Sequence, residues 1–232
     1  MKVLITGTSS GIGRATAIKF IEEGHEVVGL DIQSSSIDEH DIATLAEKKG
    51  GSYRHYTADI ADLESADGDL LACKPQILID NAGVQDSGHD IDVNLKGTIA
   101  VTEHFAMKNP DIRSVVIVGS ASGITGSEFP EYAASKGGLV AYTKNIALRL
   151  APRATANSVC PGGVVTDLNR PVMEDEKLWK QIMELTPLKR WAEPEEIAEW
   201  IYFLAVTNRF MTGQNLLIDG GEAGDMHFIW PE

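Results

Sequence analysis

The chain has 232 residues, of which 43% are hydrophobic and 22 are glycine, a composition typical of globular proteins. We expect one α/β domain over residues 1–232, long enough to bury a full hydrophobic core. The formal net charge of −14 argues against negatively charged partners, so no nucleic-acid or membrane partner is predicted.

Cysteine and histidine usage gives no indication of disulfides or metal sites. The two cysteines, Cys73 and Cys160, are far apart and form no CxxC motif, which fits a reducing compartment, so we expect a cytoplasmic protein. The histidines are scattered without an HxxxH or HExxH motif, and no metal is predicted. The apolar run within Met1–Gly7 is too short for a signal peptide and is better explained as a β-strand.

Short β-branched runs alternate with helical patterns along the chain. The expected strands are Val3–Thr6, Glu26–Leu30, Ser52–Thr57, Gln76–Ile79, Ser114–Val118, Thr155–Cys160 and Asn215–Ile218. The expected helices are Gly11–Glu23, Asp41–Lys49, Ile91–Met107, Glu131–Leu150, Asp175–Glu184 and Pro194–Val206. Most strand runs are continuously apolar, as in parallel strands buried on both faces. The alternation predicts a Rossmann-type, doubly wound parallel sheet of about seven strands flanked by helices.

The first expected strand ends in a glycine-rich turn, Thr6-Gly7-Thr8-Ser9-Ser10-Gly11-Ile12-Gly13. Gly7 permits a tight turn, Gly11 lets the backbone approach a pyrophosphate, and Gly13 lets the next helix pack closely. The helix N-terminus then offers free N–H groups to phosphates. The spacing is G-x-x-x-G-x-G rather than the common G-x-G-x-x-G. The residues predicted here to bind the cofactor are Gly7, Ser9, Ser10, Gly11, Ile12 and Gly13.

Asp31 closes the second expected strand, 24 residues after Gly7. An acid there can accept hydrogen bonds from ribose hydroxyls and would repel a 2′-phosphate, so NAD (NADH) is predicted rather than NADP. The alternative is that Asp31 only caps a turn. Its neighbour Ile32 belongs to the predicted site. Asp59 and Ile60 could contact adenine, although Asp59 could equally cap the next helix.

Tyr132 and Lys136 stand four residues apart in a predicted helix, so their side chains share one face. A free phenol has a pKa of about 10, and a fixed ammonium beside it lowers that pKa. The pair could therefore exchange a proton with a substrate. The spacing alone is also common on ordinary helix surfaces, so its meaning depends on the rest of the chain.

Joined to the glycine turn, Tyr132-x-x-x-Lys136 resembles the short-chain dehydrogenase/reductase family. Six further matches follow in order. They are Asp80-Asn81-Ala82-Gly83 after the fourth strand, Val93-Asn94-Leu95-Lys96-Gly97, Ser120, Pro161-Gly162-Gly163-Val164-Val165-Thr166, and, at the last strand and its border, Thr212-Gly213-Gln214 and Asp219-Gly220-Gly221. Pro187 through Ala198 looks most like the 3-oxoacyl-carrier-protein reductase and sugar or polyol dehydrogenase group. The resemblance implies further cofactor contacts from Asn81, Ala82, Gly83, Tyr132, Lys136, Pro161, Gly162, Val164 and Thr166.

The resemblance also implies a catalytic set. Tyr132 would be the general acid or base, and Lys136 would lower its pKa and hold the nicotinamide ribose. Ser120, with Ser122 as a rival, would donate a hydrogen bond to the reacting oxygen. Asn94 would hold a proton-relay water, or would instead brace the backbone. Thr166 would bond the carboxamide, or would simply cap the following segment.

Three features depart from the family pattern. Asp80 replaces the usual first asparagine of its motif. Only thirteen positions separate Asn81 from Asn94, so the helix there should be clipped at its N-terminus. The region 60–75 looks too short for a full third helix.

Substrate specificity is expected to lie in residues 83–92 and 167–188, and the C-terminal tail is expected at a subunit interface. Residues 167–188 resemble the segment that closes over substrate in the family, and their apolar content suggests a substrate with apolar surface. The tail, residues 222–232, is apolar from Met226 to Pro231, as interface segments often are. We hypothesise that it packs on a neighbouring subunit or beside that subunit's active site, in a homo-oligomer that is a tetramer or dimer.

The motifs together predict an NAD(H)-dependent oxidoreductase that interconverts a small secondary alcohol and a ketone. One alternative is a 3-oxoacyl-carrier-protein reductase-like enzyme, although this acidic chain offers no clear basic docking patch. Another is a non-catalytic nicotinamide-binding regulator, and a third is an epimerase or dehydratase acting on a nucleotide sugar. The intact residue set argues against the regulator, and the short chain argues against the nucleotide-sugar enzyme.

Overall fold

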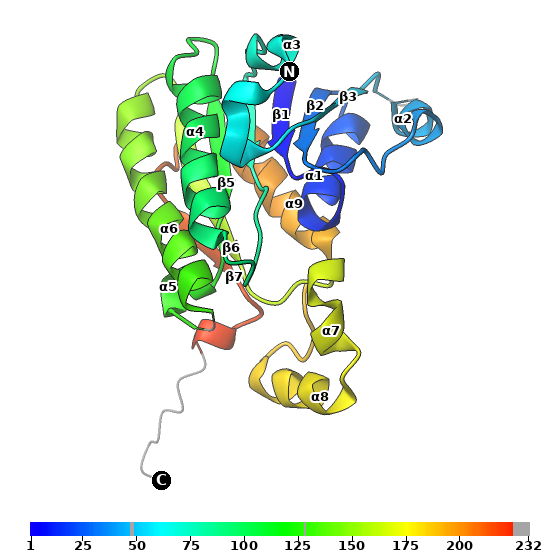
Figure 1. Ribbon diagram of the computed structural model, residues 1–232, viewed down its shortest axis with the longest axis vertical. Helices are drawn as coiled ribbons and strands as arrows, with labels where there is room; N and C mark the ends of the chain where they lie inside the picture. The colour runs from blue at the N-terminus through cyan, green and yellow to red at the C-terminus, as the bar shows by residue number, and fades with distance from the viewer. Residues whose placement is uncertain (47–48, 128, 225–232) are drawn as a thin grey trace.

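The computed structural model describes residues 1–46, 49–127 and 129–224, and its strands form one parallel sheet (Figure 1). The strands are β1 (Lys2–Thr6), β2 (Glu26–Asp31), β3 (Ser52–Thr57), β4 (Ile77–Asp80), β5 (Ser114–Val118), β6 (Thr155–Pro161) and β7 (Asn215–Ile218). They lie in the order β3-β2-β1-β4-β5-β6-β7, and every neighbouring pair is parallel. The predicted fold class is confirmed, and each predicted strand end is within one residue of the observed end.

The helices follow the predicted alternation. The longer ones are α1 (Gly11–Glu22), α2 (Glu39–Ala46), α6 (Pro130–Leu150), α8 (Glu176–Leu185) and α9 (Pro194–Tyr202), which continues through η5 (Phe203–Thr207). One further helix runs through η2 (Ile91–Gly97), α4 (Thr98–Thr102) and η3 (Glu103–Met107). The short elements are η1 (Ile60–Ser65), α3 (Gly68–Leu71), α5 (Ser122–Thr125), η4 (Asp167–Asn169), α7 (Arg170–Met173) and η6 (Glu222–Gly224). Most of these short elements were not predicted, because a single turn shows no apolar periodicity.

The two expected shortenings of the chain are visible. The helix after β4 begins only at Ile91, and the region 60–75 forms the short pieces η1 and α3 instead of a full third helix. The predicted helix 41–49 begins two residues earlier than expected and ends at Ala46, and residues 47–48 lie outside the described part of the chain.

The core lies in two layers, one on each face of the sheet. In β1, Leu4 packs toward α4 and α6, whereas Val3 and Ile5 pack toward α1 and α9, because successive side chains of a strand point to opposite faces. All three are fully buried. Burial of each such side chain contributes roughly 1.5–3 kcal/mol to the stability of the fold. Because both faces of the sheet are covered, every position of these strands favours an apolar residue.

The parallel crossovers bring the loops that follow all strands to one edge of the sheet, the carboxyl edge. In Figure 1, α7 and α8 form a pair set apart from the sheet, below α9. They belong to the predicted substrate segment, residues 167–188, called the lid segment below. The hypothesis about the C-terminal tail falls on residues 225–232, which lie outside the described part of the chain. Among the described helices, none is long and apolar enough to cross a membrane.

Candidate active site

A cavity of about 1380 Å³ extends along the carboxyl edge of the sheet. It brings together most of the residues predicted for the site, which are Gly7, Ser10, Gly11, Ile12, Asp31, Ile32, Asp59, Ile60, Asn81, Ala82, Gly83, Ser120, Tyr132, Lys136, Pro161, Gly162, Val164 and Thr166. Three predicted residues do not line the cavity: Ser9, Gly13 and Asn94. A ligand in this cavity would touch the ends of six strands, β1 to β6, and the N-terminus of α1, which is where doubly wound folds bind ligands.

The glycine turn needs glycine at Gly7 and Gly13 for steric reasons. Gly7 has a φ of +75°, and a Cβ on it would lie 2.6 Å from the Nδ2 atom of Asn81. A Cβ on Gly13 would lie 1.9 Å from the carbonyl oxygen of Gly7. Asn81 ties the turn down, because its Nδ2 donates to the carbonyls of Thr6 and Gly7 at 2.9 and 3.1 Å. The turn therefore leaves bare backbone beside the α1 N-terminus, a shape that fits a pyrophosphate.

The acids at the ends of β2 and β3 are both hydrogen-bonded to backbone N–H groups. Asp31 accepts from the N–H groups of Ser9 and Gln33, each at 2.9 Å, and still lines the cavity. These bonds orient the carboxylate and leave lone pairs for a ligand. Asp59 accepts from the N–H of Ala61 at 2.8 Å, so the capping alternative is observed, and it also borders the cavity.

Tyr132 and Lys136 lie near the start of α6, and both side chains line the cavity. The Nζ atom of Lys136 lies 5.7 Å from the centroid of the Tyr132 ring and donates to the carbonyl of Val118 at 3.1 Å. The Lys136 side chain is buried, and this burial lowers its pKa from 10.5 to about 8. At neutral pH most of these ammonium groups keep their proton and place a positive charge beside the phenol.

Ser120 follows β5 and is buried at the cavity wall. Its Oγ accepts the N–H of Ser122 at 3.1 Å, and its own O–H donates to no residue in the described part of the chain, so it can donate to a ligand. Ser122 also lines the cavity, so both serines named from the sequence are present. Thr166 makes no capping bond to the η4 turn that follows it, and the capping alternative for this residue is not observed.

The buried side chain of Asn94 forms hydrogen bonds to two separate segments of the chain. The side chain is fully buried, accepts the N–H of Val84 at 2.7 Å and donates to the carbonyl of Val84 at 2.8 Å. Its Nδ2 also donates to the Oγ of Ser135 at 3.1 Å, and Ser135 donates to the carbonyl of Tyr132. Asn94 thus connects the loop after β4 to the turn of α6 that carries Tyr132, which matches the bracing alternative for its side chain.

Asp80, the departure from the family motif, is the last residue of β4 and is buried. Its Oδ2 accepts from the hydroxyl of Thr102 at 2.7 Å, whereas Oδ1 has no hydrogen-bond partner in the described structure. Burial raises the pKa of Asp80 from 3.8 to about 7. This carboxyl does not line the cavity, so its effect on a ligand would pass through the neighbouring residue Asn81.

The lid-segment side of the cavity contains residues that were given no individual role from the sequence, although two of them lie in the expected specificity segment 83–92. Val84 and Gln85 come from the loop after β4, Trp191 follows the lid segment, and Glu222 follows β7. The Trp191 ring packs on Gly163, where a Cβ would lie 2.0 Å from its Nε1 atom. No local motif marks these positions, because they reach the cavity only through the packing of distant loops.

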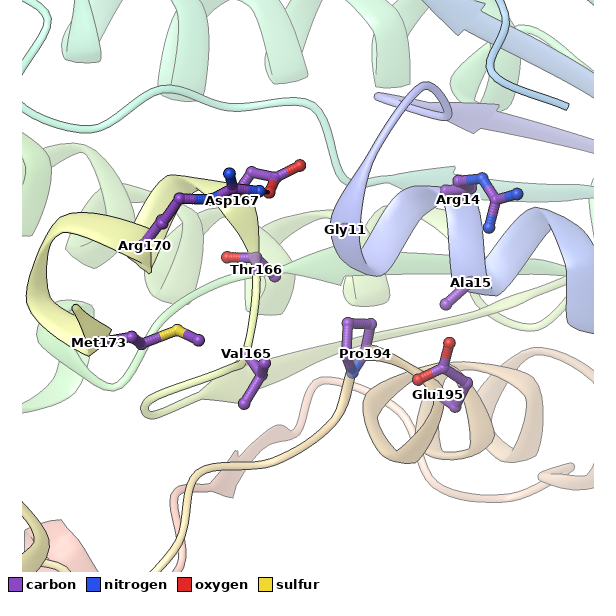
Figure 2. Close-up of a pocket in the computed structure, with 10 residues that line it drawn as sticks. All are labelled: Gly11, Arg14, Ala15, Val165, Thr166, Asp167, Arg170, Met173, Pro194 and Glu195. Carbon is purple, nitrogen blue, oxygen red and sulfur yellow. Dashed lines mark hydrogen bonds and ion pairs between the residues drawn. The ribbon is translucent and has the colours of Figure 1, made fainter.

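A smaller cavity of about 340 Å³ lies on the outer side of Thr166. Figure 2 shows Arg14 on α1, Arg170 beside Asp167, and Pro194 with Glu195 at the start of α9 around it. Arg170 is paired with Asp167. The two arginines therefore face this cavity together with acidic side chains, and the cavity is not a purely basic site.

Comparison with known proteins decides the family. A family model described as Enoyl-(Acyl carrier protein) reductase matches residues 7–222. The 3-oxoacyl-[acyl-carrier-protein] reductase of Thermotoga maritima is 34% identical over 94% of this chain and 96% of its own length. The chain belongs to the short-chain dehydrogenase/reductase family. The glucose 1-dehydrogenase of Gluconobacter oxydans is 32% identical over 99% of this chain and 95% of its own length.

Solved structures agree with this assignment. The 3-oxoacyl-[acyl-carrier-protein] reductase of Brucella melitensis, in complex with NAD, superposes with a TM-score of 0.85 at 26% identity and covers 97% of this chain and 98% of its own. Another neighbour, a candidate 2-deoxy-D-gluconate 3-dehydrogenase from Agrobacterium tumefaciens, carries NADP. The protein is thus an oxidoreductase of the class that acts on CH–OH groups with a nicotinamide cofactor.

Proposed function

We propose that this enzyme uses NAD(H) to interconvert a small secondary alcohol and the corresponding ketone. The observation that carries the proposal is that Tyr132, Lys136 and Ser120 line one cavity together with the glycine turn and Asp31. Bound NAD would accept a hydride from the carbinol carbon, and NADH would return one to the ketone. The chain's own residues would position the substrate and move the proton.

Tyr132 is assigned the proton transfer. In the oxidising direction its phenolate would take the hydroxyl proton, and in reduction its phenol would give that proton back. Lys136 supports the phenolate because its buried ammonium lies beside the ring. Ser120, whose O–H has no acceptor among the described residues, would donate a hydrogen bond to the reacting oxygen.

The preference for NAD over NADP is assigned to Asp31. Its carboxylate is held by two backbone N–H groups and borders the cavity, and a 2′-phosphate placed there would meet a negative charge. The glycine turn supports a dinucleotide of either kind and does not discriminate between them. Nicotinamide-loop contacts from Pro161, Gly162, Val164 and Thr166 belong to the same proposal.

A small-molecule substrate is favoured over an acyl-carrier protein. The chain carries 34 acidic against 20 basic residues, and an acidic carrier protein would be repelled by such a surface. The regulator alternative is disfavoured, because a protein that only senses the cofactor would not need the Tyr132, Lys136 and Ser120 arrangement.

A homo-oligomer in the cytoplasm completes the proposal. Large apolar side chains stay exposed on α6 and on the α9 helix, among them Leu148 at 82% and Trp200 at 43%. Exposed apolar groups of this size are typical of subunit interfaces. Light scattering of the full chain would give the mass of the particle in solution, and the mass of a monomer would contradict the proposed homo-oligomer.

The test is NADH absorbance at 340 nm with a panel of alcohols and ketones. We expect turnover with at least one substrate, and Tyr132→Phe should lower kcat by about 10²- to 10⁴-fold. Tyr142→Phe is the matched control, because Tyr142 lies on the same helix but does not line the cavity. Equal activity of wild type and Tyr132→Phe would refute the assigned role of Tyr132.

A further inference from the structure

Glu222 places a carboxylate in the wall of the cavity on its substrate side. It begins the short turn η6 after β7, and it lines the same cavity as Ser120 and Tyr132. It lies where the end of the lid segment meets the loop after β6. None of the roles given above to the other residues makes use of this acid.

Hydrogen bonds fix the position of Glu222. Its Oε1 accepts from the hydroxyl of Thr186 at 2.5 Å, and Thr186 is buried directly after α8. The single proton of that hydroxyl is shared with the carbonyl of Ile182 at 2.9 Å. Asp219 stabilises the turn, because its carboxylate accepts hydrogen bonds from the backbone N–H groups of Gly221 and Ala223 at 3.0 and 2.8 Å. The acid is therefore presented by a rigid turn and not by a freely rotating surface position.

The second oxygen of the carboxylate, Oε2, faces Gly162. A Cβ on Gly162 would lie 3.1 Å from it, so the oxygen lies close beside the loop expected to hold the nicotinamide. In the described part of the chain no donor or cation pairs with Oε2. The nearby cations are used elsewhere: Arg190 pairs with Glu196, and Lys189 donates to the carbonyl of Glu184.

The rest of the lid wall is mainly apolar, and its polar members are Asn169 and Asp167, which is paired with Arg170. Val172, Ile182 and Leu185 line it, and the Trp191 ring closes it above Gly163. Beside a mainly apolar wall, a carboxylate oxygen forms a strong hydrogen bond with a ligand donor, and its charge makes the binding of an anion unfavourable. The ligand that fits is an apolar-faced molecule with a hydroxyl group at this point.

We propose that Glu222 is a specificity-determining residue that accepts a hydrogen bond from a substrate hydroxyl remote from the reacting carbon. The enzyme would then act on neutral polyhydroxylated compounds, namely polyols and sugars, in preference to monofunctional alcohols and to carboxylates. This inference rests on the proposed function, because it places the reacting oxygen of the substrate at Tyr132 and Ser120.

The experiment compares wild type with Glu222→Gln and Thr186→Val. Xylitol, D-glucose and myo-inositol are the polyhydroxylated probes, cyclohexanol and 2-butanol lack a second hydroxyl, and D-gluconate carries a carboxylate. Glu222→Gln keeps an acceptor for Thr186 but removes the charge, whereas Thr186→Val removes the bond to the lid segment and keeps the carboxylate. Circular dichroism and Tm establish that each variant is folded.

We expect wild type to favour a polyhydroxylated probe, and Glu222→Gln to lower the ratio of its kcat/KM to that of cyclohexanol by about 10- to 100-fold. The KM for NAD should not change, and Glu222→Gln should use D-gluconate better than wild type does.

An unchanged ratio of the two kcat/KM values would overturn the inference. A change in the KM for NAD alone would assign the carboxylate to the cofactor, and an equal effect of Thr186→Val would assign it to lid positioning; either overturns the inference.

Failure of the proposed function is distinguishable. If wild type turns over no alcohol or ketone, the same probes are titrated by calorimetry into the protein saturated with NADH. Binding of a polyhydroxylated probe that Glu222→Gln weakens about 10-fold or more would still support the inference. Equal binding by both proteins, or no binding by wild type, would overturn it.

Discussion

The ammonium of Lys136 lies 5.7 Å from the centroid of the Tyr132 ring and is anchored to the Val118 carbonyl at 3.1 Å. The helix spacing accounts for the shared face, but the anchor comes from β5. Burial lowers the pKa of Lys136 to about 8. The Lys136 ammonium, whose charge supports a Tyr132 phenolate, is therefore present below about pH 8. Burying this charge lowers the free energy of unfolding of the protein.

Lys136→Met should abolish turnover and make the folded chain more stable at pH 7. An unfolded lysine keeps its proton to about pH 10.5, whereas folded Lys136 loses it near pH 8, so the folded state carries an unfavourable buried charge at lower pH. We expect a gain of about 1–3 kcal/mol at pH 7 after allowing for the lost bond to Val118. The gain should shrink between pH 8 and 10.5 in urea unfolding. A variant less stable than wild type at pH 7 would show that Lys136 stabilises the fold.

Asp80→Asn should stabilise the chain above neutral pH. The pKa of Asp80 is raised to about 7, so the folded state binds more protons than the unfolded state between about pH 4 and 7, and stability falls as pH rises through that window. The asparagine does not titrate, so its advantage should be small at pH 4 and reach as much as about 4 kcal/mol by pH 8. Urea unfolding at both pH values measures it. Asp111→Asn, at an exposed acid before β5, is the control, and the same pH dependence in both variants would contradict the role of burial.

Asp31→Asn should relax the preference against NADP. The substitution keeps the shape of the side chain and one carbonyl oxygen but removes the charge that would face a 2′-phosphate. A repulsion of this kind at partly shielded distances is worth up to about 4 kcal/mol, so the ratio of kcat/KM for NADP to NAD should rise about 10- to 1000-fold. Initial rates with both cofactors give the ratio. If wild type already prefers NADP, the assignment of Asp31 is wrong.

Asn94→Ala distinguishes the bracing role from the relay role. The side chain makes two bonds to Val84 and one to Ser135, so its removal should lower the free energy of unfolding by about 2–4 kcal/mol. Because Val84 lines the cavity, the KM for substrate should rise more than kcat falls. Unfolding in urea and steady-state kinetics are measured on the same preparation. A fall in kcat with unchanged stability would instead favour the proton relay.

Strand and helix positions were predictable because they depend on local patterns. The apolar runs of β1, β4 and β5 mark strands buried on both faces, and only their ends differ, by one residue at most. Short turns such as α5 and α7 were missed, since four residues carry no periodic signal. The roles assigned to Ser120, Tyr132, Lys136 and Asn94 stay predictions until the variants are measured.

By itself the sequence determined what depends on spacing along one element: the glycine turn, the acid that ends β2, and the shared face of Tyr132 and Lys136. Only the tertiary structure decided what depends on residues distant in the chain. It buries Asp80 against Thr102, ties Asn94 to Val84 and Ser135, and sets Glu222 between Gly162 and Thr186. The reason is physical: covalent geometry and helix periodicity are local, whereas burial and hydrogen bonding of a side chain depend on which other segments pack against it.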